Sequence, residues 1–297
     1  MAVPAKKITS FEDEFNRRYG SIKTVNREVK LRKDGSPKKT HPNNVEGRST
    51  WVDPIKEVDD IEKILEYINM RIETENREDY KWQWERNKLY FFMAVFSGFR
   101  VCDLVGARPG TKYKKKDKDG NIYYEYPEWT GLKWNDVFEK DGVTFKDEIV
   151  VKELKTSHDG KIRMRRVPLA EETKECICGY VNKYNPDTKS SDYIFLNRQK
   201  ERLSAKTIEK FIKEVTEECD VKGNFSTHSF RKTCAYNMYM GMVDNIGEKM
   251  ALEETMRFTG HRSLQAFLSY LGIQKDDNKK RVSALSNRLS TATKGKI

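Results

Sequence analysis

One stretch of this sequence is apolar on nearly every side of a helix, and it limits the possible folds more than any other feature. The segment WQWERNKLYFFMAVFSGF, residues 82–99, contains no proline, and Gly98 near its end is typical of a helix terminus. Its second half, from Leu89 to Phe96, consists of apolar and aromatic side chains. A helix of this kind is stable only when other elements cover all of its faces. The chain therefore has to build a helical domain around residues 82–99.

Several amphipathic segments can supply that cover. Apolar residues from Ile55 to Ile72 recur at spacings of three and four, which predicts a helix with Asp53 as its N-cap and Pro54 in its first turn. Similar patterns predict further helices over about 170–183, 204–219, 227–241, 248–258 and 263–271, and a short one near 10–19.

Two segments predict β-hairpins instead. Residues 109–129 are charged and aromatic around the turn signal KDKDGN, which indicates a surface hairpin inserted into the domain. Residues 144–167 predict a second hairpin, in which the turn TSHDGK joins TFKDEIVVKEL to IRMRRVPL and Pro168 ends the ladder. The expected fold is mainly α with a small antiparallel β-sheet, an α+β class.

The two ends of the chain differ from this domain. Residues 1–50 hold 12 Lys and Arg against 6 Asp and Glu and are rich in turn residues, so we expect a largely flexible basic arm. Residues 51–272 should form a single domain that carries the insertion at 109–129. Residues 273–297 form a polar tail, in which Val282, Leu285 and Leu289 share one helix face.

Charge and composition exclude several classes of protein. The chain has 57 Lys and Arg against 46 Asp and Glu, a formal charge of +11, which favours a polyanionic partner such as DNA or RNA. No apolar run approaches the roughly 20 residues that cross a bilayer, and the N-terminus lacks the apolar region of a secretory signal. The five cysteines are odd in number and form no CxxC pair, which is typical of reduced thiols in a cytoplasm.

Several polar residues suggest chemistry on a phosphate. Arg100 follows the apolar helix directly, at the start of a second helical segment whose free N–H groups could bind an anion with it. His228 and Arg231 lie three residues apart at the start of a predicted helix, so they share one face. Arginine can make bidentate contacts with a phosphodiester, and histidine can donate or accept a proton there. His261 lies in a loop, and Tyr270 follows nine residues later at the end of the last predicted helix.

These motifs, in this order, resemble those of the tyrosine recombinase (phage integrase) family. GFRVCDLVGAR resembles the family's first-arginine box, with Arg100 at the arginine position and Asp103 at the acidic position one turn later. ELKTSHDGKIRMRRVPL resembles the family's hairpin that ends in VPL and supplies Lys155, with Lys161 as the alternative because the turn is long.

The remaining two boxes complete the resemblance, which covers roughly residues 53–272 and implies the family's catalytic fold. THSFRKTCA resembles the box that supplies His228 and Arg231, and FTGHRSLQAFLSYLG resembles the box that supplies His261 and the nucleophile Tyr270. By this resemblance Tyr270 would attack a DNA phosphodiester and form a 3′-phosphotyrosyl link, which conserves the bond energy without ATP.

The resemblance also implies roles for the other residues. The guanidinium groups of Arg100 and Arg231 would neutralise the charge that develops on the phosphate in the transition state. Lys155 would protonate the departing 5′-oxygen, His228 would act as a base or proton shuttle near the tyrosine, and His261 would donate a hydrogen bond to the phosphate.

The implied function is site-specific recombination of double-stranded DNA, by a homotetramer on two sites, that integrates or excises a phage, plasmid or transposon. A resolvase, a type IB topoisomerase-like enzyme and a non-catalytic DNA-binding regulator of the same fold are the alternatives. Neither a metal nor a cofactor is implied: acidic pairs such as Asp59–Asp60 are typical of solvated faces, and no GxxxxGK[ST] or GxGxxG motif occurs.

The sequence departs from the family's pattern in two places. Family members usually carry a helical core-binding domain ahead of the catalytic one, and residues 1–50 are too few and too polar for it. We expect either a minimal recombinase, whose basic arm replaces part of the DNA clamp, or a shortened form of a longer protein. The insertion at 109–129 suits a DNA backbone or minor-groove contact, or a solvated hairpin. The tail 273–297 stands where the family's C-terminal segment docks on a neighbouring protomer.

Overall fold

The structure is a computed structural model that describes residues 51–107, 113–125, 130–158, 161–261, 263–272 and 282–283. The predicted basic arm, the helix near 10–19 and the two leucines of the tail, Leu285 and Leu289, lie outside these residues. Val282 is exposed. The division into arm, domain and tail therefore stays a prediction.

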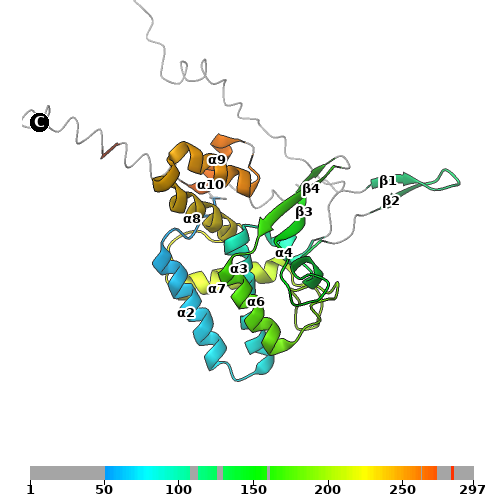
Figure 1. The fold of residues 1–297 in the computed structure, drawn as a ribbon, viewed down its shortest axis with the longest axis horizontal. Helices are drawn as coiled ribbons and strands as arrows, with labels where there is room; N and C mark the ends of the chain where they lie inside the picture. The colour runs from blue at the N-terminus through cyan, green and yellow to red at the C-terminus, as the bar shows by residue number, and fades with distance from the viewer. Residues whose placement is uncertain are drawn as a thin grey trace, which may run out of the picture. The chain divides into compact units, whose positions relative to one another are not determined.

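The long helix α3, Glu78–Ser97, lies at the centre of the core, as its apolar run predicts. It packs against α2 (Val58–Thr74), α6 (Glu171–Tyr184) and α8 (Ser229–Ile246), which cover it from different sides (Figure 1). Phe96 is the exception in the run: it is 38% exposed and stacks on Phe92, with ring centroids 5.9 Å apart.

Helices α7 (Ala205–Glu218), α9 (Glu248–Thr259) and α10 (Leu264–Leu271) lie close to the predicted positions. The short helix α4 (Val101–Val105) follows Arg100, where a second helical segment was expected, and the one-turn helix α5 (Trp134–Val137) was not predicted. Helices α8, α9 and α10 enclose a second, smaller apolar cluster that includes Tyr239, Leu252, Phe267 and Leu271. Across the described ranges, no helix combines the length and the apolar character that a bilayer crossing requires.

The predicted start of the first helix in the domain is wrong. Helix α2 begins at Val58 with Glu57 as its N-cap residue, and Asp53 does not cap it. The Asp53 carboxylate instead accepts hydrogen bonds from Trp51 Nε1 at 2.7 Å and from the backbone N–H of Asn224 at 3.0 Å. The Asp53 N–H donates to the Asn224 carbonyl at 2.8 Å. These tertiary bonds outcompete the local cap and hold the chain extended ahead of α2.

Within the described residues, the β-structure consists of two separate two-stranded antiparallel sheets, and with the helices it confirms the mainly α, α+β class. Strands β3 (Glu148–His158) and β4 (Lys161–Pro168) form the hairpin predicted over 144–167. The strand β3 continues through the residues expected in the turn, and the register is irregular between Glu153 and His158. Strands β1 (Tyr113–Lys116) and β2 (Ile122–Glu125) pair in the predicted insertion.

Candidate active site

A glycine turn at the end of α3 presents Arg100. Gly98 adopts a left-handed conformation with φ 58°, and its N–H donates to the Ala94 carbonyl at 3.0 Å. A Cβ at this position would lie 3.0 Å from Cys234 Sγ, so both the backbone angle and the close approach favour glycine. Arg100 then becomes the N-cap residue of α4, where its N–H donates to Asp103 Oδ2 at 3.3 Å.

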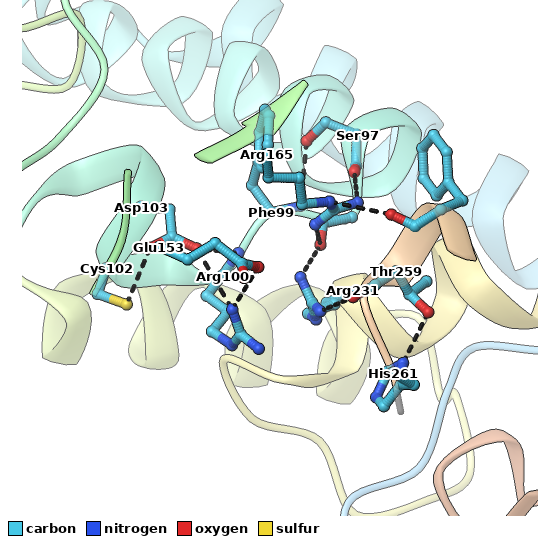
Figure 2. A network of polar contacts seen from close by, with 12 residues as sticks. Ser97, Phe99, Arg100, Cys102, Asp103, Glu153, Arg165, Arg231, Thr259 and His261 are labelled. Atoms are coloured by element: carbon cyan, nitrogen blue, oxygen red, sulfur yellow. Dashed lines mark hydrogen bonds and ion pairs between the residues drawn. The ribbon is translucent and has the colours of Figure 1, made fainter. Parts of the chain in front are cut away.

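Arg100 is paired with a buried carboxylate from the β3–β4 hairpin. Its Nη1 donates to Glu153 Oε1 at 2.7 Å, and Glu153 is only 4% exposed (Figure 2). Burial raises the pKa of the Asp103 carboxyl, which lies 3.9 Å from the same guanidinium nitrogen. The turn that presents Arg100 and the β3–β4 hairpin are therefore held together by the ion pair between Arg100 and Glu153.

Arg231 joins the end of α3 to the end of α9. It lies in the first turn of α8 and is 2% exposed. Its Nη1 donates to the Gly98 carbonyl at 2.5 Å and its Nη2 to the Thr259 carbonyl at 2.5 Å (Figure 2). A guanidinium has five N–H groups, so these two bonds leave three that can bind an anion.

The C-terminal cap of α9 orients His261. Gly260 ends the helix with φ 74°, and the His261 N–H donates to the Met256 carbonyl at 2.9 Å. Thr259 Oγ1 donates to the Thr255 carbonyl at 2.7 Å and lies 2.6 Å from His261 Nδ1. The hydroxyl has one proton, so when it donates to the Thr255 carbonyl, Nδ1 carries a proton and donates to Thr259. In the neutral ring, Nε2 is then the free acceptor.

The electrostatic surroundings keep His261 neutral. Burial lowers the pKa of its imidazole to about 4, and the nearby charges of Arg231 and Arg100 act in the same direction. An anion that neutralised these arginines would raise this pKa again.

Tyr270 of α10 lies against His261. The two ring centroids are 4.5 Å apart with an interplanar angle of 49°. The tyrosine hydroxyl is buried and makes no hydrogen bond with a residue that the structure describes. Burial raises its pKa to about 12, while the charges of Arg231 and Arg100 oppose this rise.

The structure thus brings together four of the six predicted site residues: Arg100, Arg231, His261 and Tyr270. His228 occupies the N-cap position of α8, and its side chain is exposed. Lys155 lies in β3, two residues beyond Glu153, and the structure does not describe its side chain. The same holds for the alternative, Lys161, at the start of β4. The roles of His228 and Lys155 stay predictions.

The sequence analysis missed Arg165, a buried arginine of β4. Its Nη2 donates to the Ser97 carbonyl at 2.7 Å, its Nη1 to the Gly98 carbonyl at 2.8 Å and its Nε to the Phe258 carbonyl at 3.0 Å (Figure 2). The guanidinium lies between the rings of Phe99 and Phe258, 5.0 and 5.1 Å from their centroids. Burial lowers the pKa of Arg165 to about 10. Arg165 therefore fixes the turn that carries Arg100 against the end of α9.

Strand alternation carries a signal for Arg165 and Glu153. Residues two apart in a strand share a face, so Arg165 faces the same way as Val167, and Glu153 the same way as Val151. Both valines are buried, and Arg165 pairs across the hairpin with Val151. A charged residue on the apolar face of a strand is uncommon and marks a position with a specific partner.

The sequence model of the phage integrase family matches residues 126–276, just over half of the chain. The chain belongs to the phage integrase family. The matched segment contains His228, Arg231, His261 and Tyr270, whereas Arg100 precedes it and is joined to the site by the contacts with Glu153 and the Gly98 turn.

Among solved structures, this integrase-family chain is similar to XerH site-specific recombinase in a post-cleavage complex with palindromic difH substrate. They share 16% identity with a TM-score of 0.49, and the match covers 85% of this chain and 61% of that one. A lambda integrase(75-356) dimer bound to a COC' core site shares 16% identity with a TM-score of 0.45, and the match covers 77% of this chain and 62% of that one. The Tn1549 transposon integrase (aa 82-397) in complex with circular intermediate DNA shares 13% identity with a TM-score of 0.42, and the match covers 76% of this chain and 62% of that one. This chain thus spans about three fifths of each of these chains. The comparison with curated proteins gives no match.

Proposed function

We propose that this chain is a site-specific DNA recombinase that cleaves and rejoins DNA through a covalent 3′-phosphotyrosyl link on Tyr270. The observation that carries the proposal is the convergence of four residues from three distant stretches of the chain. Arg231 donates to the carbonyl of Thr259, the hydroxyl of Thr259 lies 2.6 Å from His261 Nδ1, and the ring of His261 lies against Tyr270. The charge of Arg100 acts on both His261 and Tyr270.

The arrangement suits an attack of a phenol oxygen on a phosphodiester. The free N–H groups of Arg231 and Arg100 can bind the non-bridging oxygens and neutralise the charge that develops in the transition state. The bound phosphate raises the pKa of His261, so that Nε2 gains a proton and donates a hydrogen bond to the phosphate. With the Nδ1–H tautomer, the role that the family resemblance gives to His261 requires proton uptake on DNA binding.

The finer parts of the proposal follow the family. Lys155 protonates the departing 5′-oxygen, and His228 takes the proton from Tyr270. A tetramer of this chain joins two duplexes in the cytoplasm and integrates or excises a mobile element.

The decisive experiment is covalent trapping on a nicked duplex that carries the sequence protected in a footprint of the DNA around this chain's gene. The wild-type chain should form a covalent protein–DNA adduct, because the nicked fragment diffuses away before it can be rejoined. Tyr270→Phe removes only the attacking oxygen and should bind the duplex without forming the adduct. Tyr80→Phe, a matched loss of one hydroxyl at an exposed tyrosine of α3, should behave as the wild type.

Three results would count against the proposal. A Tyr270→Phe chain that still forms the adduct would remove Tyr270 from the role of nucleophile. A wild-type chain that binds the duplex without forming an adduct would favour a DNA-binding regulator. Adducts on DNA of any sequence would favour a topoisomerase-like enzyme.

A further inference from the structure

Next to Arg231, a buried lysine lies between two aromatic rings. Lys232 is 6% exposed, and its Nζ lies 3.9 Å from the centroid of the Trp51 ring and 5.0 Å from that of Tyr270. The same nitrogen donates to the Val52 carbonyl at 2.6 Å. None of the motifs in the sequence analysis assigns a role to this residue.

The segment that holds Lys232 is itself fixed. The Trp51 indole donates to Asp53 Oδ1, and the backbone N–H of Ile55 donates to Thr233 Oγ1 at 2.9 Å. A Cβ at Gly272 would lie 3.6 Å from Trp51 Cζ2, so the indole packs against the end of α10. The extended segment ahead of α2 therefore contacts both the helix that carries Lys232 and the helix that carries Tyr270.

A cation over the ring of a tyrosine acts on the protonation of its hydroxyl. The phenolate is attracted to a positive charge much more strongly than the neutral phenol is. Among the described residues, Arg231 and Arg100 also act on Tyr270 and favour the phenolate, Cys234 opposes it, and the neutral ring of His261 lies against the phenol ring. Burial raises the pKa of Tyr270 to about 12, and each nearby cation lowers it and so increases the fraction of the reactive phenolate at a given pH.

We propose that Lys232 is a positioning residue for Tyr270: clamped by Trp51 and the Val52 carbonyl, its ammonium orients the phenol ring and favours the phenolate that attacks DNA. The proposal rests on the proposed role of Tyr270 in strand cleavage. It adds the segment ahead of α2 to the machinery that prepares the nucleophile.

The test measures the titration of the Tyr270 phenol directly. With 3-fluorotyrosine incorporated at position 270 of the full chain, the ¹⁹F chemical shift against pH reports the ionisation of that one side chain. Lys232→Gln keeps a donor for the Val52 carbonyl and removes the charge, and we expect the midpoint to rise by about one pH unit. Lys232→Arg keeps the charge and should leave the midpoint within a few tenths of a pH unit of the wild type.

A matched control removes a cation from a tyrosine elsewhere. Lys183 Nζ lies 5.5 Å from the ring centroid of Tyr184 in α6, so Lys183→Gln should leave the titration at position 270 unchanged. In the trapping assay, with Tyr270 unmodified, Lys232→Gln should form the adduct about tenfold more slowly at pH 7, and Lys232→Arg should restore most of the rate.

The outcomes separate this inference from the proposed function. A Lys232→Gln chain whose phenol titrates at the wild-type midpoint overturns the inference, whatever its rate of adduct formation. A wild-type chain that forms no adduct overturns the proposed function, but the titration of the Tyr270 phenol still tests whether Lys232 favours the phenolate. If Lys232→Gln does not fold, Trp51→Ala exposes the ammonium to water, and the midpoint should rise by a smaller amount; an unchanged midpoint there also refutes the inference.

Discussion

Replacing Arg165 by methionine should destabilise the fold far more than the same replacement at its neighbour Arg166. Methionine fills a similar volume but donates no hydrogen bond, so the carbonyls of Ser97 and Phe258 lose the guanidinium donor. The Gly98 carbonyl keeps its bond from Arg231. A buried polar group left without a partner costs about 1–3 kcal/mol, which gives about 2–6 kcal/mol for two carbonyls.

Part of this cost is recovered because a buried charge is no longer desolvated, so we expect a net loss of about 2–4 kcal/mol in the free energy of unfolding. The side chain of Arg166 is 66% exposed, and its nearest carboxylate oxygen, on Glu148, is 3.8 Å away. Arg166→Met should therefore change the stability by no more than about 0.5 kcal/mol.

Urea unfolding of both variants, monitored by circular dichroism, measures the difference in their free energies of unfolding, provided that the two variants have the same dependence of this free energy on urea concentration. Equal losses for Arg165→Met and Arg166→Met would refute the reasoning, because the three carbonyl bonds of Arg165 would then contribute nothing. A large loss for both would mean that the hairpin itself, and not the buried network, sets the stability.

Three further predictions concern charge. Glu153→Gln removes the carboxylate that is hydrogen-bonded to Arg100, so the DNA-free chain should melt at a lower temperature and regain the difference with saturating duplex. A thermal shift assay measures both temperatures, and no rescue by DNA would mean that Arg100 does not contact the phosphate. His261 has an unfolded pKa of 6.5 and a folded pKa of about 4, so the unfolded chain binds more protons between these values. Stability should therefore fall as pH falls from 6.5 to 4, and His261→Asn should remove part of that fall in urea unfolding at pH 7 and pH 5; an equal fall in both chains would contradict the folded pKa. Deleting residues 1–50 should flatten the dependence of log Kd on log salt for duplex DNA, and an unchanged slope would show that this arm does not contact the DNA.

The helices could be predicted because their patterns are local. The apolar run from Leu89 to Phe96 identifies the central helix without reference to the rest of the chain, and the period of the later helices locates them to within a few residues at most ends. The prediction failed where a distant partner decided the local structure. Asp53 has the sequence context of an N-cap, but Asn224, 171 residues away, takes its carboxylate.

The hairpin shows the same limit at a finer scale. Alternation places Glu153 and Arg165 on the buried face, which the sequence analysis could have used. It does not place Lys155, because the register between Glu153 and His158 is irregular and the alternation cannot be carried across it. The family resemblance, and not the strand pattern, is what selects Lys155.

The arrangement of the site depends on groups that leave no trace in the sequence. Both Arg231 and Arg165 donate to the carbonyl of Gly98, within the turn that presents Arg100, and Arg231 also donates to the carbonyl of Thr259 beside His261. Every residue has a backbone carbonyl, so motifs can name the arginines but not the atoms that hold them. Because the two bonds of Arg231 use only two of its five N–H groups, this side chain can fix the two turns and still offer donors to a phosphate. Under the proposed function, the geometry needed for strand cleavage and the stability of this end of the domain are therefore coupled. The variant Arg231→Lys, which has no fork of donors, should lose both strand cleavage and stability together.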